Sequence, residues 1–194
     1  MEERYGPGSQ WLVCAIMCAV GLLLMRFAQH APLPQALVAG MDWPLQLGLG
    51  AAGGAVVGAG SLYTALFQSR HKLARRTAES YALLDLRGLN PVWISLAAGI
   101  GEETLFRAGL QPLLGLWPAA LLFTVLHLRV YDFKIADRVS WMQAGGVFAM
   151  GVALGLVFEH VGLIAAIAAH AVIDIFGLYA VKIVDSRDAG APWE

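Results

Sequence analysis

Residues 91–114 read PVWISLAAGIGEETLFRAGLQPLL, an apolar stretch with two adjacent glutamates and an arginine near its middle. A helix needs about 20 mostly apolar residues to cross the hydrocarbon core of a bilayer. Each ionisable side chain at that depth costs at least about 2.5 kcal/mol, so such residues are functional candidates by default. The stretch therefore predicts both a membrane fold and a polar site within it.

The composition of the whole chain agrees with a membrane protein. Of the 194 residues, 58% are hydrophobic and 14% are charged, and the mean hydropathy is +0.64. Soluble domains carry about a quarter charged residues. The net charge is −1, and no basic patch interleaved with aromatic residues indicates a nucleic-acid partner.

Six apolar segments are predicted to span the bilayer, at residues 9–27, 44–67, 91–114, 116–131, 141–158 and 162–184. Lys and Arg gather in alternate connections, with five in residues 68–90 and three in residues 129–140. The connections between these hold none, so the positive-inside rule places both termini in the cytoplasm. The predicted fold class is all-α, a polytopic transmembrane bundle of about six spans.

We divide the chain into three predicted parts. They are two N-terminal transmembrane helices with a basic cytoplasmic connection (residues 1–90), a core of four transmembrane helices (91–184) and a cytoplasmic tail (185–194). The first span is interpreted as a retained helix, because the residues before it lack the positive charge of a signal peptide. Glycines make the span 44–67 a close-packing helix, and the basic connection suits anionic headgroups of the lipid bilayer.

Polar residues fall within three of the predicted spans. Glu103 and Arg107 are four residues apart and are expected to pair along one helix face. Glu102 points about 100° away from Glu103, toward a different neighbour. This spacing predicts a division of labour, in which the arginine holds one carboxylate and the other is free to act as a base or to bind a metal.

The other two spans contribute histidines. His127 follows Phe123 by one helical turn, and His170 precedes Asp174 by one turn. At about 1.5 Å per residue, these groups and Glu102 are expected to meet in the cytoplasmic half of the bilayer. Glutamate and two histidines are ligand types of hydrolytic zinc sites, while a carboxylate with histidines can also activate water without a metal. Both alternatives remain open at this point.

Three short motifs, taken together, resemble a known family. Glu102-Glu103-Thr-Leu-Phe-Arg107 fits EExxxR, Phe123-Thr-Val-Leu-His127 fits FxxxH, and His170-Ala-Val-Ile-Asp174 fits HxxxN/D. In this order on successive membrane helices they resemble the CPBP family, which comprises the CAAX prenyl endopeptidases and the bacteriocin-processing or immunity (Abi) proteins. The resemblance covers residues 91–179 and implies an intramembrane endopeptidase with a helical core.

The resemblance also implies residue roles. Glu102 would activate the attacking water with His127 as its partner, and His170 with Asp174 would bind a metal or stabilise the oxyanion. Catalytic roles are thus expected for Glu102, Glu103, His127, His170 and Asp174. Supporting roles are expected for Arg107 and Phe123.

Members of the family are described both as metalloproteases and as glutamate-type proteases. We therefore expect a divalent metal, in the first place zinc. Its ligands would be Glu102, His127, His170 and Asp174. Many members carry Asn at the last motif position, where this chain has Asp174. The added carboxylate would favour a metal cation if it is ionised.

The expected substrate is a membrane-associated protein or peptide, cut in the cytoplasmic half of a bacterial inner membrane. The alternative function is a non-enzymatic membrane protein that binds a partner or confers bacteriocin immunity through the same fold. A proton-coupled transporter would usually show paired repeats with broken helices, and we find none in the sequence. The sequence indicates no particular oligomeric state.

Overall fold

The computed structural model describes residues 5–68 and 72–188, with side chains described as far as Asp185. Every regular element in these residues is a helix, which confirms the all-α prediction. In chain order the elements, among which η marks a π-helical segment, are α1 (Pro7–Leu23), η1 (Leu24–Ala28), α2 (Leu33–Leu37), α3 (Trp43–Phe67), α4 (Lys72–Ser80), α5 (Asn90–Glu103), η2 (Thr104–Leu110), α6 (Gln111–Leu114), α7 (Leu116–His127), α8 (Arg138–His160) and α9 (Leu163–Asp188).

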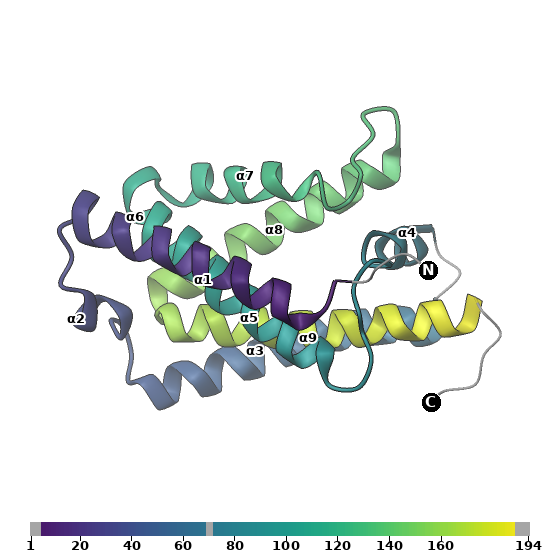
Figure 1. Cartoon of the computed structure of the whole chain (residues 1–194), viewed down its shortest axis with the longest axis horizontal. Helices are drawn as coiled ribbons and strands as arrows, with labels where there is room; N and C mark the ends of the chain where they lie inside the picture. Colours follow the sequence, from purple (N-terminus) through teal and green to yellow (C-terminus); the bar gives the residue numbers. More distant parts are fainter. Residues whose placement is uncertain (1–4, 69–71, 189–194) are drawn as a thin grey trace.

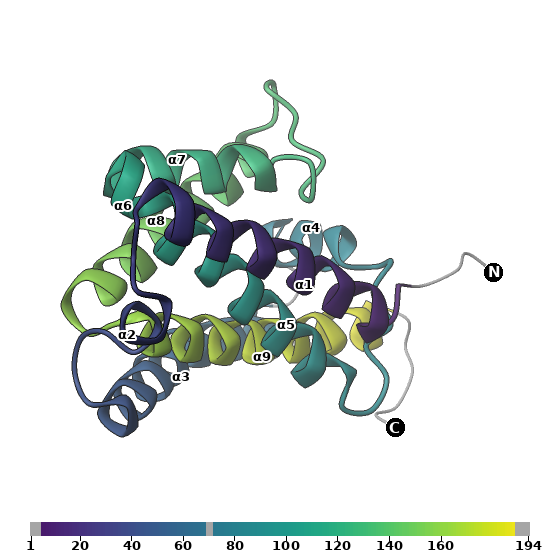
Figure 2. The same ribbon diagram turned by 60° about the vertical axis from the view of Figure 1, so that its left-hand side comes forward.

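The long helices run back and forth between two ends of a bundle (Figure 1; Figure 2). An isolated bridge between Tyr5 and Leu84 places the start of α1 beside the connection that leads into α5. A bridge between Gly40 and Gly162 places the start of α3 beside the turn between α8 and α9. The first of these ends also carries α4 and the loop after α7, which hold most of the loop cations, and we call it the basic end.

The predicted spans are found with different lengths. Within the described residues, four helices are long and apolar enough to cross a membrane, over Pro7–Ala28, Trp43–Phe67, Arg138–His160 and Leu163–Asp185. The third predicted span is one continuous helical run through α5, η2 and α6, and it carries the three charges. The predicted span 116–131 is wrong in its length, because α7 has 12 residues and the chain turns after His127. The side on which the termini lie, and the three-part division of the chain, stay predictions.

Helix α9 lies at the centre of the bundle, packed most extensively against α3 and then against α5. Glycines on one face of α3 allow the close approach, since a Cβ atom at Gly54 would lie 2.6 Å from the carbonyl oxygen of Ala169. A Cβ atom at Gly50 would meet the Ala165 carbonyl in the same way. The predicted close-packing helix is therefore confirmed for this face. Open space surrounds the glycines of the other face, Gly48, Gly53 and Gly60.

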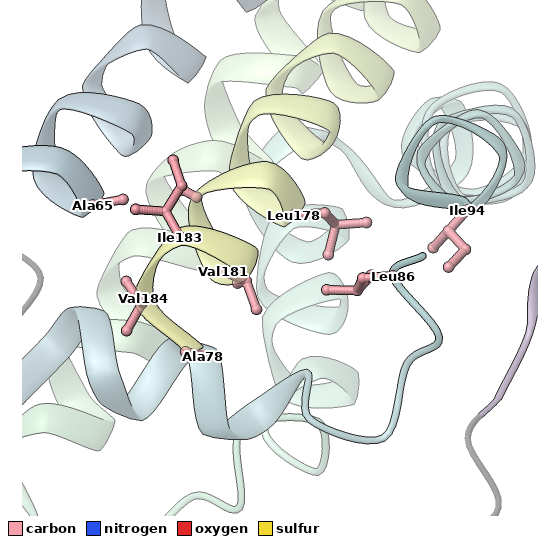
Figure 3. Close-up of a cluster of buried hydrophobic side chains, with 9 residues drawn as sticks. Ala65, Ala78, Leu86, Ile94, Leu178, Val181, Ile183 and Val184 are labelled. Atoms are coloured by element: carbon pink, nitrogen blue, oxygen red, sulfur yellow. The ribbon is translucent and has the colours of Figure 1, made fainter. Parts of the chain in front are cut away.

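At the basic end, a hydrophobic cluster ties four helices together (Figure 3). Ala65 from α3, Ala78 from α4 and Ile94 from α5 pack with Leu178, Val181 and Val184 of α9. The short helix α4 is thus held against α9 by its apolar side. The basic connection, of which residues 69–71 lie outside the described residues, therefore contains an amphipathic helix anchored to the bundle.

Candidate active site

The backbone changes its helical form directly after Glu103. Residues Thr104–Leu110 form the π-helical segment η2, whose wider turn leaves carbonyl groups without their usual partners. The side-chain amide of Gln29 donates to the carbonyl oxygens of Ala108 and Gly109, both at 2.8 Å. A Cβ atom at Gly21 would lie 2.6 Å from the Thr104 carbonyl oxygen, so the α1 backbone presses directly against the segment. Contacts with α1 and η1 therefore support the widened turn that carries Arg107.

Glu103 is held on both of its carboxylate oxygens. Arg107 Nε donates to Glu103 Oε2 at 3.0 Å, and His170 Nδ1 donates to Glu103 Oε1 at 2.7 Å. The Glu103 and Arg107 side chains are fully buried. The predicted pairing of these two residues is confirmed, and it leaves Glu103 with no free oxygen facing a substrate.

Arg107 also packs against an aromatic ring. Its guanidinium carbon lies 5.3 Å from the centre of the Phe123 ring, within the range of a cation–π interaction. The two terminal nitrogens of this guanidinium have no hydrogen-bond partner among the described residues. The Phe123 ring also packs at 4.2 Å from the His127 ring, as its position one turn earlier predicted. Phe123 therefore connects the arginine of α5–η2 to the histidine of α7.

Glu102 faces a different set of groups from its neighbour. Its Oε2 lies 3.7 Å from His127 Nε2 and 3.9 Å from His170 Nε2. This buried oxygen accepts no hydrogen bond from the described part of the chain. The adjacent glutamates therefore separate as the helical spacing predicted, with one fixed in a buried network and the other directed toward two imidazoles.

Hydrogen bonds on the far side of each ring fix the orientation of both histidines. His127 Nδ1 lies 2.8 Å from the backbone carbonyl oxygen of Phe123, and His170 Nδ1 is bonded to the Glu103 carboxylate. Both partners only accept, so each Nδ1 carries the hydrogen. In the neutral imidazoles both Nε2 atoms then present lone pairs toward Glu102. A water molecule among these three atoms can donate its two hydrogens to two of them, for example to Glu102 Oε2 and to one Nε2.

Asp174 completes the cluster at its open side. Its Oδ2 lies 3.4 Å from His170 Nε2, and its side chain is 38% exposed, compared with 17% for Glu102 and 8% for His170. The structure thus brings together all of the side chains for which catalytic roles are expected from the motifs. The more exposed edge of the cluster lies at Asp174 and His127.

The expected metal can be tested against these positions. Nitrogen and oxygen ligands at about 2.0–2.1 Å from a tetrahedral zinc lie roughly 3.4 Å from each other. The separations of 3.7 and 3.9 Å around Glu102 are longer. Within the described residues, no group of three or more His, Cys, Asp or Glu side chains could hold a metal ion as it lies. The ligand types suit zinc but their present positions do not, so no reaction step is derived through a metal.

Two tyrosines beside the cluster were missed in the sequence. The hydroxyl groups of Tyr81 and Tyr131 lie 2.9 Å apart, and their rings meet edge to face. Tyr131 is one turn beyond His127, to whose carbonyl oxygen it donates its backbone N–H at 3.3 Å. Tyr81 packs on the apolar cluster that contains Leu178, one turn beyond Asp174. The signal that was available is the spacing of four residues between His127 and Tyr131.

The tyrosine pair lies within the electrostatic reach of the Asp174 and Glu102 carboxylates. Burial raises the pKa of Tyr81 well above its usual range, and the charges of Tyr131, Asp174 and Glu102 add to the rise. The pair joins the turn after α4 to the turn after α7. The cluster is therefore bordered at the basic end by two hydrogen-bonded phenols.

Comparison with known proteins agrees with the motifs. Residues 88–176 match the model of the family described as type II CAAX prenyl endopeptidase Rce1-like. A curated relative, described as the uncharacterized protein YpbD of Bacillus subtilis (strain 168), is 36% identical over 84 residues. That alignment covers 43% of this chain and 41% of the relative, so the chain matches less than half of the relative's length.

No solved structure matches the chain. The family match contains all three motifs, and it confirms the resemblance on which the expected activity rests. The four long apolar helices agree with a protein of the membrane. Residues 88–176 of this membrane protein therefore resemble the Rce1-like family of type II CAAX prenyl endopeptidases.

Proposed function

We propose that this chain is an intramembrane endopeptidase that hydrolyses a peptide bond of a membrane-associated protein or peptide with Glu102 as its general base. The family match supports a peptidase. The observation that carries the proposal is the position of Glu102 Oε2, which faces His127 Nε2 and His170 Nε2 and accepts no hydrogen bond from the described residues.

The reaction starts with a water molecule held among these acceptor atoms. Glu102 takes a proton from the water while the oxygen of that water attacks the scissile carbonyl carbon. His127 Nε2, 3.7 Å from Glu102 Oε2, accepts the second hydrogen of the same water and so orients it. The protonated Glu102 then gives its proton to the leaving amine, so that the C–N bond breaks and the carboxylate is regenerated.

His170 stabilises the negative charge that develops on the carbonyl oxygen. Glu103 fixes its ring through Nδ1, and Nε2 donates a hydrogen bond to the oxyanion when that nitrogen carries a proton. Asp174, 3.4 Å from the same nitrogen, orients this donor. Arg107 holds Glu103 in place, and Phe123 packs against both Arg107 and His127. These residues are proposed to support the reaction without touching the water.

The location of the reaction follows from the charge distribution. The cluster opens beside the tyrosine pair at the basic end, which the positive-inside rule assigns to the cytoplasm. We propose the inner membrane of a bacterium as its place, with a substrate that reaches the site from the bilayer. Zinc or another divalent metal, with Glu102, His127, His170 and Asp174 as its ligands, remains the alternative activator. It would require Glu102 to move closer to the two histidines, whereas His170 and Asp174 already lie 3.4 Å apart.

Purified wild-type protein and Glu102→Gln test the proposal in detergent. Both are incubated with prenylated and unmodified membrane-anchored peptides, the products are identified by mass spectrometry, and bound metal is measured. We expect cleavage by the wild type and a loss of about a thousandfold in Glu102→Gln. The matched control is Glu159→Gln, which lies at the C-terminal end of α8, the end farther from the basic end of the bundle. This variant should retain cleavage.

The outcomes separate the alternatives. Full cleavage by Glu102→Gln would overturn the role of this residue. Stoichiometric zinc that is lost in His170→Ala would move the proposal to a metalloprotease. A folded wild type that cleaves none of the offered peptides would favour the non-enzymatic binding or immunity function.

A further inference from the structure

A basic cleft of about 540 Å³ opens at the basic end of the bundle, and none of the residues of the catalytic cluster lines it. Six charged side chains line it, from α4, from the loop after α7 and from the residue before α8, namely Lys72, Arg75, Arg76, Glu79, Lys134 and Asp137. The volume lies within the range of about 300–1,000 Å³ that is typical of small-molecule sites. Neither the motifs nor the proposed hydrolysis uses these residues.

Helix α4 faces the cleft with its charged side. Lys72, Arg75, Arg76 and Glu79 follow the spacing i, i+3, i+4 and i+7, which places them on one helix face. On the other face, Ala78 is buried against Val181 and Val184 of α9 (Figure 3). The docked apolar side therefore fixes the basic side of the helix toward the cleft.

The lining leaves an excess of positive charge. Both lining carboxylates already have partners within the protein. Asp137 accepts hydrogen bonds from the Val139 backbone and the Ser140 hydroxyl, both at 3.1 Å, and Glu79 lies 3.6 Å from Arg76. Beside the cleft, Asp132 pairs with Lys134 at 3.1 Å and with Arg76 at 3.3 Å. Four cations therefore face three carboxylates, and the formal charge of +1 around the cleft favours an anion.

The height of the cleft indicates the source of that anion. Lys72 follows the end of α3 at Phe67 by five residues, and Asp137 directly precedes α8, so the cleft lies where two membrane-spanning helices begin and end. Trp141, in the first turn of α8, is 56% exposed, as is typical of aromatic residues at the level of lipid headgroups. A headgroup phosphate reaches this level without leaving the membrane.

We infer that the cleft binds the phosphate group of an anionic phospholipid headgroup. The cations of α4 and Lys134 would surround the phosphate, while the acyl chains would remain in the bilayer beside α3 and α8. Such a lipid would link α4 to the loop after α7, two segments already joined by the hydrogen bonds from Arg76 to Asp132 at 3.3 Å. Free phosphate shares this chemistry, and the experiment distinguishes the two sources.

Binding of short-chain phosphatidylglycerol to the purified protein in neutral detergent tests the site. Affinity is measured from the shift of the unfolding midpoint with lipid concentration, and short-chain phosphatidylcholine is the comparison lipid. The test variant is Lys72→Gln with Lys134→Gln. The matched control is Arg87→Gln with Arg129→Gln, which removes two cations from the same end outside the cleft.

We expect phosphatidylglycerol to bind the wild type more tightly than phosphatidylcholine. Each cation near a headgroup contributes about fivefold in affinity, so the cleft variant should bind roughly 25-fold more weakly, and the control variant should change less than about threefold. Inorganic phosphate that displaces the lipid would support the site with free phosphate as a further ligand, and phosphate without effect would support the headgroup alone. Equal losses in both variants, or no loss in the cleft variant, would overturn the proposal.

Discussion

Helix α9 takes part in two contacts of opposite character. Against α3 it forms a close seam of small residues, in which Gly50 and Gly54 lie on the backbone of Ala165 and Ala169. Toward α5 and α7 it presents His170, which enters a network of buried charges. His170 directly follows Ala169, so the seam positions the polar cluster. The comparison shows that the polar site depends on packing against α3, a helix that contributes no residue to the site.

Removing the buried cation of Arg107 should have the largest effect on the polar contact of α9, measured as a loss of stability. Arg107→Met leaves the Glu103 carboxylate buried with His170 as its remaining partner. Loss of one partner from a buried ion pair typically destabilises by about 3–5 kcal/mol. Unfolding of the variant by denaturant in detergent measures this change.

The control is Arg87→Met, since the Arg87 side chain is 87% exposed and pairs with the neighbouring Asp85. It should change the free energy of unfolding by less than about 0.5 kcal/mol. A change below about 1 kcal/mol in Arg107→Met would contradict the view that the buried network holds the cluster together.

Filling the seam tests the other side of the comparison. In Gly54→Leu the new side chain meets the Ala169 carbonyl and Val172, so α9 must shift away from α3. Overpacking of this kind costs about 1–3 kcal/mol, and the shift should also lower cleavage by moving His170. Thermal unfolding and cleavage rate measured on the same preparation check both effects.

Gly53→Leu is a matched control one residue away. Nothing lies within 4 Å of a Cβ atom at Gly53, so the added side chain enters open space on the outer face of α3. Stability and cleavage should both remain close to the wild type. If the two variants behave alike, the seam does not position His170.

The tyrosine pair should give the smallest effect. Tyr131→Phe removes the hydroxyl that meets Tyr81 at 2.9 Å and leaves the packing of the ring unchanged. Loss of one such hydrogen bond costs about 1 kcal/mol, and we expect kcat to fall a few-fold with little change in KM. Steady-state kinetics check this, with Tyr63→Phe on the exposed side of α3 as the control. An unchanged kcat would limit the pair to a structural role.

Much of the cluster could be predicted from spacing alone. Glu103 and Arg107, His170 and Asp174, and Phe123 and His127 are each one turn apart, and local helical geometry places each pair on one face. That Glu102 and Glu103 face different neighbours followed from the same geometry. The close packing of α3 followed from its glycines, although only one face of the helix uses them.

Other features arise from contacts that local spacing does not encode. The π-helical segment η2 depends on the approach of Gly21, which lies in the first predicted span, and on the amide of Gln29, which follows that span. The early end of α7 separates Tyr131 from the helix and turns it toward Tyr81, 50 residues away in the chain. Such long-range contacts appear only when the helices are assembled.

The central claim is that the two adjacent glutamates do different work, and one paired measurement tests it most directly. Glu102→Gln and Glu103→Gln are compared for kcat and for the free energy of unfolding, each in folded protein. We predict that Glu102→Gln loses about a thousandfold in kcat while its stability stays near that of the wild type, whereas Glu103→Gln is destabilised by about 3–5 kcal/mol. Equal kcat losses at unchanged stability in both variants would contradict the account.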